Sequence, residues 1–477
     1  MSNNKNDVTM DKIVSLCKRR GFIFSGSEIY GGLANAWDYG PYGVELKNNI
    51  KQRWWRKFVL EREDMVGLDA AIIMNPETWK ASGHLDNFSD PLVECKKCNS
   101  RFRSDELLRR AHLGKVQILP LDHELQRELL IKEKITCPIC NSVSWSEPRQ
   151  FNLMFKTFIG PAEKSSNIAY LRPETAQGIF VNFKNVMDTS RPKLPFGIGQ
   201  IGKAFRNEIT PGNFVFRTRE FEQMEIEYFI APPKKDKDWQ AAFEMWRQEI
   251  INWMKELGLD VKHDIYELNV PDGERAHYSK KTIDFEYKFP FGQKELYGLV
   301  YRTDYDLKQH AEFSGADLSY TDDKGNKFTP HVIEPSLGVE RTLLAVLCAA
   351  YNEENLTQPH PSPGQGKIET RVVMKFPPWL APVKIAVFPL LKNKPELVKK
   401  AKAVFDLLKK DYACEFDDNG NIGKRYRRQD EIGTPYCLTV DFDSLKNGDL
   451  TVRDRDTMKQ ERVKIEKLGE WFRGKLK

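Results

Sequence analysis

The sequence predicts an α+β protein with a second, smaller α/β domain at its C-terminal end. Residues 196–230 alternate in the way of a long β-hairpin, and residues 237–257 place apolar side chains at helical spacing. Beyond Pro382 the pattern changes to strand, helix, strand, which is typical of βαβ units. We therefore expect an antiparallel sheet with packed helices, followed by a mixed domain in the last hundred residues or so.

Composition limits the class of protein. The chain has 477 residues, of which 40% are hydrophobic and 30% charged, so it fits about three globular domains rather than a disordered chain. No apolar run reaches the roughly 18 residues that a membrane span needs, and the first residues lack the apolar core of a signal peptide. The eight cysteines are too few for a disulfide scaffold at this length, so we expect a reduced, cytoplasmic protein.

The positive charge is concentrated toward the C-terminal end. From residue 380 onward there are 22 Lys and Arg against 16 Asp and Glu, an excess equal to the whole net charge of +6. Within this stretch, residues 424–428 combine four cations with Tyr426. Such a mixture suits phosphate contacts and base stacking, and the alternative is an ordinary solvated basic loop.

Three further segments organise the chain. Residues 8–60 begin with helical periodicity and contain a Gly-rich turn at 31–41. In the helix predicted at 237–257, we expect the stripe formed by Trp239, Trp246 and Trp253 to be core rather than a ligand site. Residues 359–366 are rich in Pro and Gly, and we expect a linker or loop there.

The predicted hairpin has a charged face. Its second strand is expected to run from Phe214 to Tyr228, and one side of it would carry Arg217, Arg219, Phe221, Gln223, Glu225 and Glu227. The charges sort by sign, with the arginines near the turn, the carboxylates further along and a ring between them. This order suits a ligand with an anionic end, a flat ring and a cationic end. The alternative is a solvated face with cross-strand ion pairs.

An arginine also stands where another strand meets a helix. Residues 331–350 predict a short strand, a turn and an apolar helix whose first turn contains Arg341. A cation is unfavourable at a helix N-terminus unless an anion lies between the two. The alternative is an ion pair between Arg341 and a nearby carboxylate such as Glu340.

Two Cys-x-x-Cys pairs suggest a metal site. Cys95, Cys98, Cys137 and Cys140 are the ligand type of a structural four-thiolate zinc site, which leaves no open coordination position. The 38 intervening residues exceed the usual spacing of roughly 15–20. The alternative is four unliganded thiols, or a site that has lost its metal.

Several motifs resemble those of class II aminoacyl-tRNA synthetases. Residues 205–208 look like the second signature motif, residues 338–341 look like the third, and the segment ending at Pro76 looks like the first. Residues 171–178, 219–225 and 334–336 are similar to blocks of the homodimeric type of glycyl-tRNA synthetases. The resemblance covers nearly the whole chain, from Arg20 to Asp456.

The resemblance implies an ATP-dependent ligase that activates glycine as glycyl-adenylate and transfers it to the 3′ end of tRNA(Gly). It implies Arg206, Glu208 and Arg341 as the catalytic residues. The ATP-binding residues that it implies are Arg206, Asn207, Glu208, Phe216, Arg217, Phe221, Glu295, Leu296, Gly338, Glu340 and Arg341. The glycine-binding residues that it implies are Arg103, Glu174, Phe221, Glu222, Gln223, Glu225, Glu334, Ser336 and Gly338.

The resemblance also implies a domain plan and partners. A class II antiparallel-sheet catalytic domain is expected at 1–378, with a zinc-ribbon-like insertion at 92–150 and a helical α+β insertion at 232–290. An α/β anticodon-binding domain is expected at 379–477. The expected cofactors are ATP as a substrate, Mg²⁺ and a structural Zn²⁺. The expected partners are glycine, tRNA(Gly) and a second copy of the chain in a homodimer.

Three rival functions fit parts of this pattern. The first is a synthetase-like protein that binds nucleic acid without catalysis, but such a relative is expected to lose Arg206 and Arg341. The second is a class II synthetase for another amino acid, which the glycine-type blocks disfavour. The third is a zinc-ribbon DNA-binding protein, which would use less than a fifth of the chain.

Overall fold

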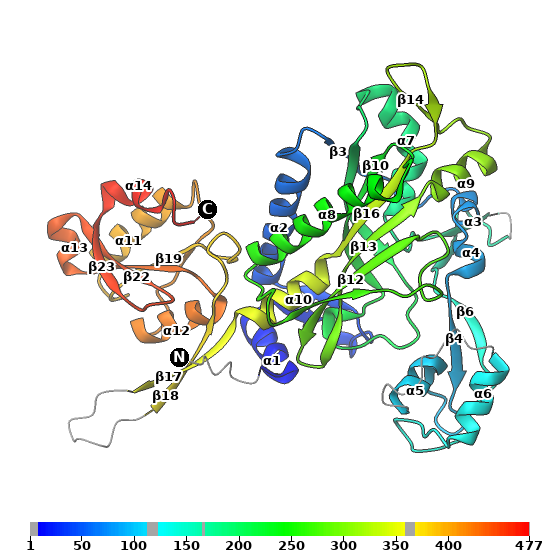
Figure 1. The fold of residues 1–477 in the computed structure, drawn as a ribbon. Helices are drawn as coiled ribbons and strands as arrows, with labels where there is room; N and C mark the ends of the chain where they lie inside the picture. Colours follow the sequence, from blue (N-terminus) through cyan, green and yellow to red (C-terminus); the bar gives the residue numbers. More distant parts are fainter. Residues whose placement is uncertain (1–7, 112–122, 165–166, 358–367, 477) are drawn as a thin grey trace.

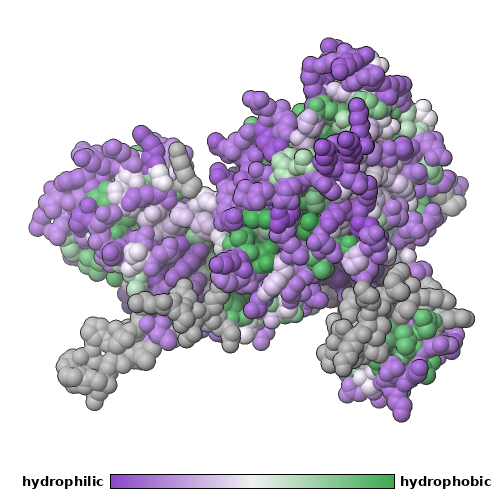
Figure 2. Space-filling model, viewed as in Figure 1, coloured by the Kyte–Doolittle hydropathy of each residue, from purple (hydrophilic) through white to green (hydrophobic). Residues whose placement is uncertain are grey.

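The computed structural model describes residues 8–111, 123–164, 167–357 and 368–476. It shows a large body, a smaller C-terminal domain and a peripheral lobe formed by the Cys region (Figure 1). The linker expected at 359–366 lies outside the described residues. In the described ranges, no helix combines the length and the apolar character needed to cross a membrane. The face shown in Figure 2 is mostly hydrophilic, with hydrophobic residues gathered in smaller patches.

A seven-stranded sheet forms the centre of the large body. Its strands, in spatial order, are β11 (Ile265–Asn269), β12 (Lys281–Phe289), β13 (Gly292–Thr303), β16 (His331–Gly338), β10 (Glu220–Ile230), β9 (Phe196–Phe205) and β3 (Met65–Gly67). All neighbours pair antiparallel except β3, which runs parallel to β9. The predicted antiparallel sheet is confirmed, and the segment 232–290 supplies two of its strands, β11 and β12, at one edge.

Helices cover both faces of this sheet. On one face α1 (Met10–Arg20), α2 (Pro41–Trp55), α8 (Asp236–Glu256) and α10 (Val339–Ala350) form the main core with Met224 and Ile226 of β10. On the other face α7 (Ala176–Ser190) and α9 (Tyr305–Ser314) pack around Phe196 and Phe229. The tryptophan stripe of α8 lies in the main core, which confirms the expectation of a packing role.

The alternation of side chains along β10 separates apolar from polar groups. Met224 and Ile226 enter the main core, whereas Gln223, Glu225 and Glu227 point to the opposite face and are buried there. The pairing register places Glu225 between Gln200 of β9 and Ser336 of β16. The charged face is therefore enclosed within the protein, and the alternative of a solvated outer face is wrong.

The hairpin differs from the prediction near its turn. Strand β10 begins at Glu220 rather than Phe214, and Phe214–Phe216 forms a single 3₁₀ turn. Asn213 and Phe214 have φ values of 55° and 58°, which an extended strand does not allow, and Phe214 is buried in the main core. Arg217 and Arg219 therefore lie in the connection before the strand and not on its alternating face.

The Cys region forms the peripheral lobe. Strands β4 (Ser89–Glu94), β5 (Arg101–Arg103) and β6 (Arg149–Asn152) make a three-stranded sheet beside α5 (Ser104–Ala111) and α6 (His123–Lys132). A small separate core contains Val93, Leu108, Leu130 and Trp145 together with Cys95 and Cys137. A lobe with so small an apolar core gains much from an additional cross-link.

The C-terminal domain has the predicted α/β pattern. Its five-stranded sheet has the order β20 (Cys414–Phe416), β19 (Ile385–Pro389), β21 (Tyr436–Val440), β22 (Asp449–Asp454) and β23 (Gln460–Lys464). The first three strands are parallel and the last two antiparallel. The helices are α11 (Pro395–Leu408), α12 (Ile422–Ile432), α13 (Phe442–Asn447) and α14 (Leu468–Phe472).

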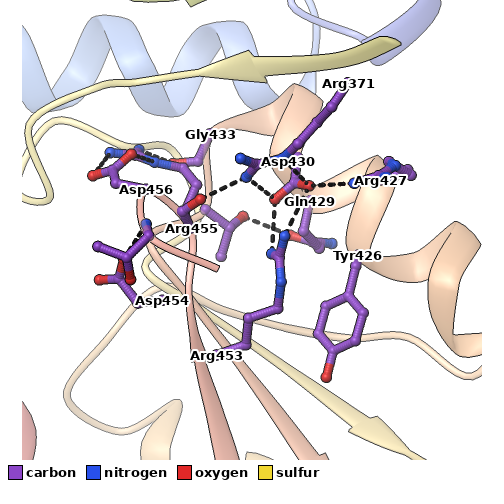
Figure 3. Close-up of polar contacts among 12 residues, drawn as sticks. Arg371, Tyr426, Arg427, Gln429, Asp430, Gly433, Arg453, Asp454, Arg455 and Asp456 are labelled. Atoms are coloured by element: carbon purple, nitrogen blue, oxygen red, sulfur yellow. Dashed lines mark hydrogen bonds and ion pairs between the residues drawn. The ribbon is translucent and has the colours of Figure 1, made fainter. Parts of the chain in front are cut away.

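A buried ion cluster ties this domain to the rest of the chain (Figure 3). Arg371 lies on β18 (Ile368–Met374), which pairs with β17 (Tyr351–Thr357) directly after α10. Its guanidinium donates two hydrogen bonds of 2.8 Å to Asp430 of α12, and Arg453 of β22 donates two more to the same carboxylate. Because a buried pair resists separation, α12 is held firmly to the connecting hairpin.

Candidate active site

A cavity opens where β10, β13, β16 and α10 meet the connection that follows β9. It is lined by Arg206, Glu208, Val215, Phe216, Arg217, Thr218, Phe221, Gln223, Glu295, Leu296, Ser336, Gly338, Glu340 and Arg341. The three residues predicted to be catalytic are among them, as are all the predicted ATP-binding residues except Asn207. The sequence did not single out Val215 and Thr218, which carry no distinctive chemistry.

Arg206 lies in the cavity with its charge available. Its Nε donates a 3.0 Å hydrogen bond to the Pro173 carbonyl, and its Cζ lies 5.3 Å from the ring centroids of both Phe88 and Phe221. Within the described parts of the chain, Arg206 forms no ion pair with a carboxylate. The guanidinium is thus fixed by a neutral acceptor and two rings and remains free to bind an anion.

Arg341 lies in the first turn of α10, as predicted. Its Nη1 donates a 3.2 Å hydrogen bond to the Glu295 carbonyl and lies 3.1 Å from the Glu295 carboxylate, while its Cζ lies 4.6 Å from the Phe216 ring centroid. Arg341 lowers the pKa of Glu295. Arg341 therefore has a carboxylate partner, as the alternative prediction stated, but this partner is Glu295. Glu340 pairs instead with Lys47 at 2.6 Å.

Glu208 faces the same cavity, and one of its carboxylate oxygens is free to accept a hydrogen bond. Its buried Oε2 has no hydrogen bond among the described residues, and the Arg217 Nε lies 3.8 Å away from it. Arg217 in turn donates a 2.9 Å hydrogen bond to its closer carboxylate, Glu106 of α5. The peripheral lobe therefore reaches the rim of the cavity through Glu106.

Three predicted residues lie elsewhere. Glu222 occupies the opposite face of β10, because it is out of step with Gln223 and Glu225, and it pairs with Lys47 at 2.6 Å and Lys51 at 3.0 Å. Arg103 is outside the cavity, where Asp90 and Asp105 each hold it at 2.8 Å.

Asn207 also does not line the cavity. Its backbone N–H donates a 2.7 Å hydrogen bond to the Leu153 carbonyl, which anchors the connection after β9.

Behind Gln223 and Ser336 lie the other carboxylates predicted for the site. Glu225 accepts hydrogen bonds from Thr175 Oγ1 and, at 2.8 Å, from Ser336 Oγ. Glu334 accepts a 3.0 Å hydrogen bond from Arg302. These two glutamates are almost fully buried, so a ligand that passes Ser336 meets a strongly acidic environment.

Glu174 belongs to the same acidic region. It accepts a 3.0 Å hydrogen bond from Gln177 and lies 3.4 Å from His84 Nε2. Burial raises the pKa of Glu174, but His84 and Arg302 outweigh it and lower the pKa below its usual range. Glu174 is therefore ionised near neutral pH.

Sequence reasoning missed the groups that hold these acids in place. Arg302 of β13 is fully buried and donates two 2.8 Å hydrogen bonds to Asp306 of α9 besides its bond to Glu334. Gln177 bridges Glu174 and Asp306, with 3.0 Å to each. The one available signal was an arginine inside a mostly apolar strand, followed four residues later by an aspartate.

The four Cys-pair thiols come together in the peripheral lobe. All four Sγ atoms lie within 4.8 Å of one another, with 3.5 Å between Cys95 and Cys140 and 3.7 Å between Cys98 and Cys137. Sulfurs bound tetrahedrally about 2.3 Å from one Zn²⁺ would lie about 3.8 Å apart. The donor set and its spacing therefore fit this ion.

Each Cys pair sits in the same kind of turn. Asn99 N–H donates to the Cys95 carbonyl at 2.8 Å and Asn141 N–H to the Cys137 carbonyl at 2.9 Å. Asn99 and Asn141 have φ values of 56° and 57°, a left-handed conformation that asparagine tolerates well. The two halves thus present their thiols with matching backbone geometry.

The basic residues near position 425 lie on helix α12 and not in a loop. Lys424, Tyr426, Arg427 and Arg428 line an open groove that also includes Arg453. Arg425 does not belong to this surface, because it is only 1% exposed and donates hydrogen bonds to the carbonyls of residues 389, 418 and 420. Three of the four predicted cations therefore face the groove.

Comparisons with known families follow this division of the chain. Residues 158–350 match the family model of the tRNA synthetase class II core domain (G, H, P, S and T). Residues 384–475 match the model of an anticodon binding domain. The fold is thus that of a class II aminoacyl-tRNA synthetase core with an attached anticodon-binding domain.

Full-length relatives narrow the class. A glycine–tRNA ligase from Lachnospira eligens is 56% identical over 479 residues, which cover 98% of this chain and 99% of that protein. A glycine–tRNA ligase from Lachnoclostridium phytofermentans is 55% identical over 477 residues, which cover 98% of this chain and 99% of that protein. Another from Clostridium perfringens is 54% identical over 464 residues, which cover 96% of each chain. The chain belongs to the glycine–tRNA ligase family. The predicted family and fold class are confirmed.

Proposed function

We propose that this protein is an ATP-dependent ligase that attaches glycine to tRNA(Gly) in the cytoplasm. The observation that supports this most directly is the arrangement of one cavity. Arg206 and Arg341 supply cationic groups to it, Phe221 supplies a ring, and Ser336 leads to buried carboxylates. Cations, a ring and carboxylates are the partners that the phosphates and adenine of ATP and the ammonium of glycine require.

ATP would bind in the outer part of the cavity. Arg206 would hold the α-phosphate, because its guanidinium has no competing carboxylate. The adenine would lie between Phe221 and Arg341, and the unpaired oxygen of Glu208 would accept a hydrogen bond from the adenine edge. Glu295 supplies the oxygen ligand type that Mg²⁺ prefers, and that ion would neutralise charge on the leaving pyrophosphate.

Glycine would bind in the inner part. Its ammonium would lie beside Ser336, Gln223 and Glu225, with Glu174 adding negative charge, and its carboxylate would point back toward the α-phosphate. The carboxylate attacks the α-phosphorus and pyrophosphate leaves; a ribose hydroxyl at the tRNA 3′ end then attacks the carbonyl carbon of the adenylate, and AMP leaves. The protein contributes position and charge rather than a nucleophile. Larger amino acids can be excluded sterically, so no editing site is needed.

The test of this function is ATP–pyrophosphate exchange measured with each amino acid in turn. We expect exchange with glycine and little with alanine or serine. Arg206→Ala should reduce the glycine-dependent rate by about 10²–10³, because one preorganised donor to the transition state is lost. Arg247→Ala, on the exposed side of α8, is the matched control and should leave the rate unchanged. Equal exchange with alanine, or an unchanged rate in Arg206→Ala, would contradict the proposal.

We also propose that the four Cys thiols hold a structural Zn²⁺. The lobe has a small core, and a four-thiolate site would stabilise it by joining its two turns. Helix α5 of this lobe carries Glu106 to Arg217, so loosening the lobe would also disturb the rim of the cavity.

Metal content tests this site. Purified protein should contain about one zinc per chain, and Cys137→Ser should lower the zinc content and increase proteolysis within residues 89–152, because three thiolates bind less tightly. Cys414 is a partly buried cysteine of the C-terminal domain, and the Cys414→Ser variant should contain as much zinc as the wild-type protein. Protein purified without chelator that contains no zinc would rule the site out.

The C-terminal domain would bind the tRNA. We place the domain boundary near 378/379, because the two family matches fall on either side of it. The groove of α12 presents Lys424, Arg427 and Arg428 beside the ring of Tyr426, a surface suited to phosphates and unstacked bases.

A double substitution tests this surface. Arg427→Ala with Arg428→Ala should weaken tRNA binding and flatten its dependence on salt, by about 0.7 in the slope of log K for each lost phosphate contact to single-stranded RNA. Glycine-dependent pyrophosphate exchange should be retained. Arg462→Ala, whose partners are Asp441 and Asp449, is the control. Unchanged salt dependence in the double variant would exclude this groove as the tRNA surface.

A homodimer is the last part of the proposal. The segment before α2 exposes Ile29, Tyr30 and Leu33, at 89%, 86% and 64% of their surfaces. Such neighbouring apolar side chains are costly in water unless another surface covers them. A second copy of the chain would cover them, in keeping with the resemblance of the segment ending at Pro76 to the first class II motif.

A further inference from the structure

Glu227 is a buried carboxylate for which the site described so far has no use. It lies on β10 two residues beyond Glu225, on the same face of the strand, and is 0% exposed. Neither of its side-chain oxygens has a hydrogen-bond partner among the described residues. A carboxylate that is ionised, buried and without a donor is strongly unfavourable, so its protonation state needs a physical cause.

Two other carboxylates lie close to Glu227. Oxygen atoms of Glu225, Glu227 and Glu334 are all within 4.8 Å of one another. Glu225 has hydroxyl donors in Thr175 and Ser336, and Glu334 has the guanidinium of Arg302. Glu227 is the member of the three without a donor to stabilise its ionised form, so a proton shared among them resides best on Glu227.

The surroundings do not supply enough positive charge to ionise all three. The charged and titratable groups that interact with members of this cluster are Glu174, Arg172, Tyr278, Arg302 and Asp306. The rings of His84, His277 and His310 interact in turn with Glu174, Arg302 or Asp306. Three of the acids depend on the single cation of Arg302. Glu334 and Asp306 accept hydrogen bonds from it, and Glu227 lies near it. Burial lowers the pKa values of His277 and His310, so these rings are neutral near pH 7.

The pKa directions agree with this geometry. Burial raises the pKa of Glu227 well above its usual range, and the neighbouring Glu334 adds to the increase. Burial also raises the pKa of Glu334, to about 8, although Arg302 acts in the opposite direction. Because ionisation of one member disfavours ionisation of the next, the cluster keeps a proton at neutral pH.

We propose that Glu227 is a positioning residue that holds a proton while the glycine site is empty and releases it when the ammonium of glycine binds beside Glu225. This inference rests on the proposed glycine site. The ammonium brings a positive charge next to the cluster, and that charge stabilises the ionised form of Glu227. The proton leaves Glu227 for the solvent, and the newly ionised carboxylate then strengthens the hold of the cluster on the ammonium.

The proposed release of a proton determines how the affinity for glycine changes with pH. If binding releases a proton, affinity for glycine rises with pH, by up to about tenfold per unit, while the empty cluster is still protonated. The rise should continue until the pH at which the empty cluster loses its proton without help from glycine, and burial places the pKa of Glu227 well above its usual range. Over this range glycine itself keeps its ammonium form.

Calorimetry of the full-length protein measures the proton directly. Glycine is titrated at pH 7 in two buffers with different enthalpies of ionisation, and the difference in binding heat gives the number of protons released. We expect a release that approaches one proton per glycine bound. Binding of glycine with the same heat in both buffers would overturn the role of Glu227. Failure of glycine to bind in either buffer would instead overturn the glycine site, and with it this inference.

Glu227→Gln locates the proton. The amide resembles the protonated acid in shape but cannot lose a proton, so proton release should fall by at least half and the affinity for glycine should become nearly independent of pH. The wild-type protein and the variant should bind glycine with similar affinity near pH 6, and their affinities should differ by about tenfold or more near pH 8. Glu244→Gln, an exposed glutamate of α8, is the matched control. Proton release that is unchanged in Glu227→Gln would assign the proton elsewhere and contradict the proposal.

Discussion

One buried guanidinium makes the acidic floor of this site possible. Arg302 has no exposed surface and joins Asp306 of α9 to Glu334 of β16 by three hydrogen bonds of 2.8–3.0 Å. Its Cζ also lies 3.8 Å from the ring centroid of Tyr278, so the cation is enclosed on several sides. Burying carboxylates without such a cation would cost several kcal/mol for each. The position of α9 against the sheet and the negative charge of the floor therefore depend on the same residue.

The two faces of the central sheet differ: one packs in the main core and the other lines the cavity. Along β10 the even-numbered residues Met224 and Ile226 close the main core, and the odd-numbered residues Gln223 and Glu225 face the ligand side. The same alternation sends Glu222 to Lys47 and Lys51 of α2, where it helps to fix the helix. Charged contacts help to attach the outer parts of the molecule to this frame. The peripheral lobe reaches it through Glu106 and Arg217, and the C-terminal domain is held by Arg371 and Asp430.

Much of this could be predicted from the sequence. The hairpin, the strand and helix around Arg341 and the C-terminal α/β pattern each have a clear period, and the Cys pairs carry their own spacing. The turn after Arg206 could not be predicted in the same way, because a buried Phe214 with positive φ overrides the strand pattern. The structure places Arg103 and Glu222 outside the cavity, each with charged partners that residue type alone does not reveal. The role of Arg302 depends also on Glu334 of β16, which is brought to it only by the fold.

We expect the inner end of the cavity to recognise an ammonium group by buried negative charge. The most direct measurement is competition against glycine in the exchange assay by the two halves of the glycine molecule, methylammonium and acetate. We expect methylammonium to compete with glycine and acetate at the same concentration not to, because the buried carboxylates at the inner end repel acetate. Competition by acetate without competition by methylammonium would show that the inner end does not recognise an ammonium group.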